Sequence, residues 1–210
     1  MSVFTRSRAA CIASGIAIAG ASALVLAGCA GGDGGGTDAP STEDRSDLTL
    51  KIGTVLPQTG NLAFLGPPEE SGVGLAAKEV NEYTDTTKLT LDVEYGDSGD
   101  ADNKAFETTV PKLLGNGADA LIGAASSGVT KLFLDQAVGE GVITFSPANT
   151  SPDFTTWDDN GLSCRTAPSD LLHGGVLGNL IAEDAASTLG SIYLNDAYGN
   201  GPEAAPPEPF

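Results

Sequence analysis

The 210-residue sequence has few of the residues on which catalytic sites and disulfide scaffolds are built. It contains one histidine, three cysteines and one tryptophan, and 10 basic residues stand against 28 acidic ones. Three cysteines in a chain of this length provide no disulfide framework. The formal net charge of -18 argues against nucleic acid or an anionic bilayer as the partner of the folded surface. We expect neither a metal nor a cofactor.

The N-terminal segment begins with positive charge and continues with an apolar stretch. Arg6 and Arg8 precede the apolar residues 9–27, which end in Leu26-Ala27-Gly28-Cys29. This order predicts an export signal over residues 1–28. The end of the stretch resembles the lipobox of bacterial lipoproteins, which implies cleavage before Cys29, lipidation of its sulfur and a membrane anchor on the extracytoplasmic face. The alternative is a transmembrane helix that stays in place.

The segment after Cys29 has almost nothing apolar to bury. Residues 30–47 read AGGDGGGTDAPSTEDRSD, which is a composition of Gly, Ser, Thr and acid. Such a segment cannot gain enough from burial to offset the entropy of ordering. Residues 29–47 are therefore predicted to be a lipid anchor and a disordered linker.

From residue 48 onward, strand-like and helix-like patterns alternate. Strands are predicted at 48–56, 88–95, 118–122, 142–145, 162–165 and 191–194, and helices from Pro67 to about Val80 and at about 102–114, 127–138 and 170–186. Pro111 is expected to bend or shorten its helix. Alternation of this kind indicates an α/β domain with a parallel sheet flanked by helices. After Gly199 the proline-rich residues 201–210 are predicted to be an irregular tail.

Two predicted strands end in segments suited to a ligand, because ligands of open parallel sheets bind beyond the carboxyl ends of the strands. After 118–122 the chain reads GAASSG and enters a helix, whose N-terminal amides and Ser127 suit an anion. Taken alone, a helix cap formed by Ser126 or Ser127 is the better interpretation. After 142–145 the loop offers the Ala148 carbonyl and Thr150 as acceptors for an ammonium group. Together the two ends match the zwitterionic part of an amino acid.

A set of motifs in this order resembles the type I periplasmic binding proteins of the leucine/isoleucine/valine class. They are the stretch LTLKIGTVLPQTGNLAFLGPPEESGVGLAAKEVNE from residue 48, then GAASSGVT, FSPANTSP, RTAPSD and NDAYGNG. The resemblance covers roughly residues 48–201. It implies two α/β lobes that close over a ligand, with a nearly complete first lobe at 48–166 and the beginning of a second at 167–200. It also implies a monomer that delivers its ligand to the permease of an ABC importer.

The resemblance also implies roles for individual residues. Ser127 would hold the ligand carboxylate, and the Ala148 carbonyl and Thr150 hydroxyl would hold its ammonium group. Tyr198 would reach across from the second lobe, and Asp170 would contact the ligand or the hinge. Leu65 lies near the expected side-chain pocket, where close relatives often have an aromatic residue. The resemblance leaves amino acids, amides, urea and aromatic acids as possible ligands. The acidic residue that completes the family's ammonium site lies further along than residue 210, and we expect a chain of this length to bind weakly.

Three features of the sequence suggest functions other than transport. Ser126 lies one substitution from a G-x-S-x-G nucleophile elbow, but a serine hydrolase would need His173, which falls in a helical stretch. A ligand-sensing ectodomain would have the same fold and pocket. Asp97, Asp100 and Asp102 do not match the spacing of a calcium-binding EF-hand loop, so an acidic loop before a helix is favoured.

Overall fold

The computed structural model describes residues 46–185 and 188–203. The predicted export signal at 1–28, Cys29 and nearly all of the predicted linker lie outside the described residues. Within the described part of the chain, no helix is long and apolar enough to cross a membrane.

The described residues are organised around one parallel sheet of five strands. The strands are β1 (Leu48–Val55), β2 (Leu89–Glu94), β3 (Ala120–Gly123), β4 (Ile143–Ser146) and β5 (Ser163–Arg165), in the order β2-β1-β3-β4-β5. All four neighbouring pairs are parallel. The reversal of strand order after β2 makes this a doubly wound sheet, and the predicted α/β class is confirmed.

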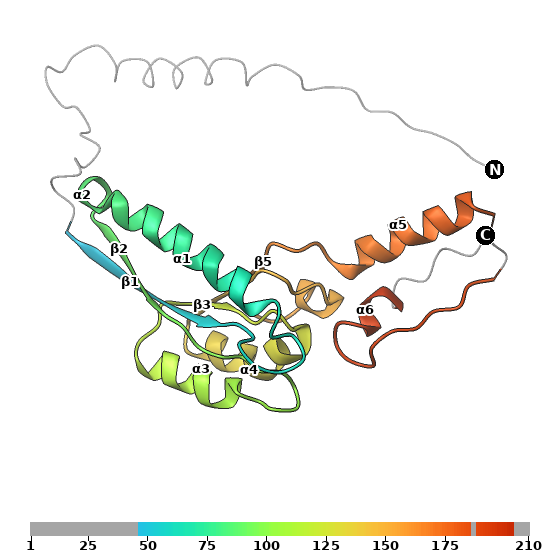
Figure 1. Cartoon of the computed structure of the whole chain (residues 1–210), viewed down its shortest axis with the longest axis horizontal. Coiled ribbons are helices and arrows are strands. Elements are labelled where there is room, and N and C mark those ends of the chain that lie inside the picture. The colour runs from blue at the N-terminus through green and yellow to red at the C-terminus, as the bar shows by residue number, and fades with distance from the viewer. Residues whose placement is uncertain (1–45, 186–187, 204–210) are drawn as a thin grey trace, which may run out of the picture. The chain divides into compact units, whose positions relative to one another are not determined.

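Helices cover both faces of the sheet. The long helix α1 (Gly66–Glu82) lies on one side with the short α2 (Thr84–Thr87), and α3 (Phe106–Gly115) and α4 (Ser127–Gly139) lie on the other (Figure 1). A 3₁₀ turn, η3, follows at Pro152–Thr155. The chain continues through α5 (Asp170–Glu183) to α6 (Asn200–Glu203).

The hydrophobic core lies between the sheet and the α3–α4 layer. Its buried members include Val55, Phe106, Val110, Leu113, Leu121, Val129 and Phe133. Gly53 of β1 allows the close packing of α3, because a Cβ atom there would lie 2.8 Å from the Leu113 side chain. Helix α4 packs on the same core through Val129 and Phe133, and it begins shortly after β3 ends.

The opposite face of the sheet is covered unevenly. Thr144 and Ser146 point into the α3–α4 side and are buried, so the alternate residues of β4 face the other way. There Ile143 is 47% exposed and Phe145 is 37% exposed. Cys164 of β5, which is paired with Phe145 in the sheet register, is also exposed. The β4–β5 half of this face therefore presents apolar side chains to solvent.

Three predictions about secondary structure need correction. The strand predicted at 191–194 does not form, and these residues have no regular structure. The helix predicted from 102 begins at Phe106, because Asp100 accepts hydrogen bonds from the amides of Asp102 and Asn103 and so folds a turn there. The helix nevertheless continues through Pro111. Contrary to the expectation of an irregular chain after Gly199, one helical turn forms at Asn200–Glu203.

Helix α5 is buried along a single narrow stripe. Asp170, Gly174 and Gly178 are its buried residues, and they are spaced four apart on one face. Ile181 is half-buried, and the other large apolar side chains of the helix are exposed, namely Leu171, Leu172, Val176, Leu177 and Leu180. Most of the apolar surface of α5 is therefore not packed against other described residues.

Candidate ligand-binding site

The two segments singled out from the sequence lie side by side in the structure. β3 and β4 are neighbours in the sheet, with Ile122 paired to Phe145, and both strands point the same way. Their carboxyl ends therefore open at the same edge, where the residues 124–126 lead into α4 and the residues 147–151 follow β4. The predicted juxtaposition of GAASSG and SPANTS is confirmed.

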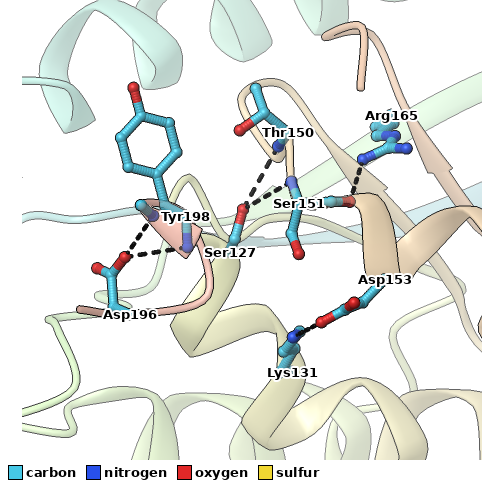
Figure 2. Close-up of polar contacts among 9 residues, drawn as sticks. Ser127, Lys131, Thr150, Ser151, Asp153, Arg165, Asp196 and Tyr198 are labelled. Carbon is cyan, nitrogen blue, oxygen red and sulfur yellow. Dashed lines mark hydrogen bonds and ion pairs between the residues drawn. The ribbon is translucent and has the colours of Figure 1, made fainter. Parts of the chain in front are cut away.

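The start of α4 uses its two serines differently. The Ser126 side chain accepts a hydrogen bond from the Val129 amide at 3.3 Å and is the N-cap of the helix. Ser127 is 1% exposed, and its Oγ accepts hydrogen bonds from the amides of Thr150 and Ser151, both at 3.4 Å (Figure 2). These two bonds are longer than the usual range. A ligand oxygen that accepted hydrogen bonds of normal length from the same two amides would therefore replace Ser127 Oγ favourably as their acceptor.

Two buried acceptor oxygens lie in the next segment of the site. Thr150 Oγ1 and Asp170 Oδ2 are buried and have no hydrogen-bond partner among the described residues. They belong to residues that are joined, because the Asp170 amide donates to the Thr150 carbonyl at 2.9 Å. The other oxygen of Asp170 lies 3.1 Å from Nδ1 of His173. Buried polar atoms are nearly always paired in native proteins, so two unpaired acceptors on adjoining residues mark a place where a hydrogen-bond donor would be stabilised.

Tyr198 lies in a turn that is held together by Asp196. Oδ1 of Asp196 accepts hydrogen bonds from the amides of Tyr198 at 3.0 Å and Gly199 at 2.7 Å (Figure 2). The residues just after this turn approach the site closely, because a Cβ atom at Gly201 would lie 2.5 Å from Asp170 Oδ2. The turn that carries Tyr198 thus adjoins the Asp170 carboxylate.

The segment after Ser151 is fastened to α4 and β5 by contacts that the sequence did not reveal. Lys131 of α4 forms an ion pair with Asp153, and Trp157 Nε1 donates to Asp135 Oδ1 at 2.8 Å. Arg165 of β5 donates to the Ser151 carbonyl at 2.7 Å (Figure 2). Lys131 and Asp135 are one helical turn apart, on the face of α4 that begins with Ser127. The four-residue spacing of Ser127, Lys131 and Asp135 is the feature of the sequence that could have indicated this arrangement.

Leu65 and Ala148 remain less defined. Leu65 is half-buried immediately before α1, and its amide donates to the Leu62 carbonyl at 2.9 Å. Its place in a side-chain pocket stays a prediction. The Ala148 amide donates to Ser146 Oγ at 3.3 Å.

The acidic loop at Asp97 and Asp100 binds backbone amides. Burial alone would raise the pKa of Asp97, but hydrogen bonds from the Thr59 hydroxyl and from three backbone amides hold this pKa below its usual range. Hydrogen bonds from the amides of Asn103 and Asn61 lower the pKa of Asp100. No group of three or more metal-ligating side chains occurs among residues 46–185 and 188–203. Both carboxylates therefore serve to fold the loop and to hold residues 58–61 against it.

The similarity to known proteins is extensive. The sequence profile of the periplasmic binding protein family matches residues 49–207. The leucine-, isoleucine-, valine-, threonine- and alanine-binding protein of Pseudomonas aeruginosa is 28% identical over 155 residues, which cover 73% of this chain and 41% of that protein. A substrate-binding protein of a chemotactic signal transduction system in Halobacterium salinarum is 28% identical over 163 residues, covering 71% and 38%. An ABC transporter substrate-binding protein from Desulfitobacterium hafniense, in complex with Leu, is 27% identical with a TM-score of 0.59, covering 75% of this chain and 46% of that one.

The chain belongs to the periplasmic binding protein family. It spans less than half the length of each of these relatives. Because the family consists of binding proteins rather than enzymes, the hydrolase interpretation of Ser126 no longer applies. The structure also gives its two residues other roles, since Ser126 caps α4 and His173 contacts Asp170. The type I fold predicted from the motifs is confirmed.

Proposed function

We propose that this chain is the extracytoplasmic substrate-binding component of an ABC importer, and that it binds branched-chain or related amino acids, or their amides, by the zwitterionic end. The observation that carries the proposal is the pair of buried, unpaired acceptors, Thr150 Oγ1 and Asp170 Oδ2, next to the Ser127 hydroxyl. An ammonium group needs acceptors that are shielded from water, and a carboxylate needs donors. Thr150 offers both kinds of group, because its hydroxyl is one of the unpaired acceptors and its amide is a donor at the Ser127 hydroxyl.

The anionic part of the ligand would bind at the start of α4. There the Ser127 hydroxyl, the Thr150 amide and the Ser151 amide already converge within 3.4 Å. The partial positive charge of the helix N-terminus favours a carboxylate in this place. When the carboxylate enters, the two amides turn from Ser127 Oγ to the ligand, and the Ser127 hydroxyl becomes a donor. No donor is lost in this exchange.

The cationic part would bind between Thr150 and Asp170. The ammonium group would donate to the Thr150 hydroxyl, to the Ala148 carbonyl and to the Asp170 carboxylate. A carboxylate that is 2% exposed needs a positive partner to offset its lost hydration. The half-exposed His173 contacts Oδ1 of Asp170, and the ligand ammonium would contact Oδ2. The Tyr198 ring, in the turn beside Asp170, would cover the ligand.

The test is calorimetry with L-leucine on the full chain and two variants. We expect Ser127→Ala and Thr150→Ala each to weaken binding about 10- to 100-fold, because each removes a hydrogen bond to a charged group, worth about 1.5–3 kcal/mol. Ser98→Ala is a matched control, since Ser98 is equally buried but donates to the Gly99 carbonyl in another loop. Affinity that is unchanged in both site variants would overturn the assignment.

A sensing function is the second candidate. It is favoured by the similarity to the Halobacterium salinarum protein of a chemotactic signal transduction system. Binding would be identical, so the two functions differ only in the partner. Uptake of labelled leucine that depends on both this chain and an ABC permease supports import, whereas a leucine response that needs this chain but no permease supports sensing.

The proposal includes a lipid anchor and a monomeric state. Its support is the sequence Leu26-Ala27-Gly28-Cys29 after an apolar stretch, together with membership of a family of periplasmic proteins. Palmitate labelling should be strong in the wild-type chain and absent in Cys29→Ala. Equal labelling of both would exclude an anchor at this cysteine.

A further inference from the structure

Two buried side chains outside the proposed ligand contacts connect the two loops of the site. Ser146 and Asn149 are each 2% exposed. Ser146 Oγ donates to the Ala124 carbonyl at 2.6 Å, and Asn149 Nδ2 donates to the carbonyls of Ala124 at 3.0 Å and Ala125 at 3.1 Å. Three hydrogen bonds therefore run from the end of β4 and the loop after it to the loop after β3. None of them is made by Ser127 or Thr150.

Ser146 also determines the direction of the Ala148 carbonyl. Its Oγ accepts from the Asn149 amide at 3.0 Å and from the Ala148 amide at 3.3 Å. The Ala148 carbonyl and the Asn149 N–H belong to one planar peptide group, in which they point in opposite directions. Because the N–H points inward to the buried Ser146 hydroxyl, the carbonyl points away from it. The hydroxyl thus directs this carbonyl out of the protein interior.

Asn149 determines the position of the residues before α4. Its amide group binds two successive carbonyls, those of Ala124 and Ala125, which precede Ser126 and Ser127. The Ala124 peptide is held from the helix side as well, because its amide donates to Thr130 Oγ1 at 3.1 Å. The backbone just before Ser127 is consequently fixed from both the loop and the helix.

We propose that Ser146 and Asn149 are positioning residues, which set the distance and orientation between the carboxylate-binding end of α4 and the ammonium-binding carbonyl of Ala148. This inference rests on the proposed function, since it concerns the same site. Without these two side chains, the loops remain connected through the long bonds from the Thr150 and Ser151 amides to Ser127. The cradle for the carboxylate then loosens, and the Ala148 carbonyl is free to rotate.

The first experiment measures amide hydrogen exchange in the full chain without ligand. We expect Ser146→Ala and Asn149→Ala to accelerate exchange of the Thr150 and Ser151 amides about tenfold, although neither amide bonds to the substituted side chain. Ser146→Thr keeps the hydroxyl and should restore the wild-type rate. Ser98→Ala and Asn81→Ala are matched controls, because Asn81 likewise bonds backbone groups, the Leu91 amide and carbonyl, in another part of the fold. Unchanged exchange at Thr150 and Ser151 in both variants would overturn the proposal.

The second experiment compares L-leucine with 4-methylpentanoate, which has the same carbon skeleton without the ammonium group. We expect Ser146→Ala to weaken leucine binding about tenfold and 4-methylpentanoate binding much less, because the Ala148 carbonyl that Ser146 orients contributes only to the ammonium. Asn149→Ala should weaken the binding of both ligands, because Asn149 holds the backbone before Ser127, where the carboxylate binds. Equal losses for both ligands in Ser146→Ala would show general loosening and would contradict a positioning role for that residue, and unchanged binding of both ligands in Asn149→Ala would contradict the role of Asn149. If the wild-type chain binds neither ligand, the proposed function fails, while the exchange experiment still decides whether the two residues position the loops.

Discussion

The amide of Asp170 donates a hydrogen bond of 2.9 Å to the carbonyl of Thr150. This bond joins the first residue of α5 to the loop after β4, so the element that leaves the sheet begins at the proposed ammonium site. The Thr150 carbonyl already accepts this bond, whereas the Thr150 hydroxyl has no hydrogen-bond partner among the described residues. A ligand at Thr150 and Asp170 would therefore touch both sides of the junction at once.

Asp170→Asn should separate binding from stability. The buried carboxylate has one unpaired oxygen, and a buried charge without full pairing costs more than a neutral amide. We expect the variant to be as stable as the wild type or more stable by about 1 kcal/mol in urea unfolding, yet to bind leucine at least about tenfold more weakly in calorimetry. His173→Ala is the control, since it removes only the half-exposed partner. A destabilised variant with normal affinity would assign Asp170 a structural role.

The acid sensitivity of the fold should depend on Asp97. Hydrogen bonds hold its pKa below the ordinary value of 3.8, so the folded state favours the carboxylate. Its contribution to stability is therefore fully present above about pH 4 and is lost as the pH falls through the lowered pKa. Urea unfolding between about pH 2 and 6 should show a flatter acid limb in Asp97→Asn than in the wild type. Parallel profiles for the two proteins would contradict this role.

Glu69 should have the opposite pH dependence. Burial raises its pKa to about 7, and its Oε2 is buried without a partner among the described residues. The folded state favours the protonated acid, so the contribution of Glu69 to stability is present below about pH 4.5 and is lost as the pH rises through 7. Glu69→Gln should therefore match the wild type at pH 4 and exceed it by about 1–2 kcal/mol at pH 8. Glu70→Gln, at an adjacent position, is the control.

Hydrogen exchange should divide the chain into a protected and a labile part. The strands β1, β3 and β4 enclose the buried core, whereas α5 is buried only along Asp170, Gly174 and Gly178. Helices with few buried apolar contacts open at low cost in free energy. We expect the amides of β1, β3 and β4 to exchange at least about 100-fold more slowly than those of α5. Uniform protection of both parts would show that α5 is stabilised as strongly as the sheet.

The sheet could be predicted because the sequences of its strands show patterns of apolar residues that are typical of strands. In β2, Leu89, Leu91 and Val93 alternate with polar residues, and the strand forms as the period of two requires. The residues Ser191–Leu194 have a similar composition but no strand forms. A strand needs a neighbour to pair with, and local sequence does not reveal whether the fold provides one. The composition of a segment thus predicted a strand correctly only where the fold provides a neighbouring strand to pair with.

The candidate site could be predicted in outline but not in its supporting contacts. The order of strand ends indicated that GAASSG and SPANTS would meet, and they do. The roles of Ser146 and Asn149 were not visible, because both bond to backbone carbonyls of Ala124 and Ala125. The sequence identifies each side chain, but every residue has a backbone carbonyl, so the sequence does not indicate which carbonyl a side chain will bind. Contacts of this kind become apparent only when the two loops are seen together.

The exposed Ile143 and Phe145 on the lightly covered face of the sheet affect how the chain behaves at high concentration. They lie beside β5, a short edge strand whose three residues offer unpaired backbone groups to another chain. With a net charge of -18, the molecules repel one another at neutral pH. Salt screens this repulsion, and acidification toward the isoelectric point near 4.1 removes it. Colloidal stability of the chain therefore depends on electrostatic repulsion, and its solubility should fall as salt rises and as the pH approaches that point.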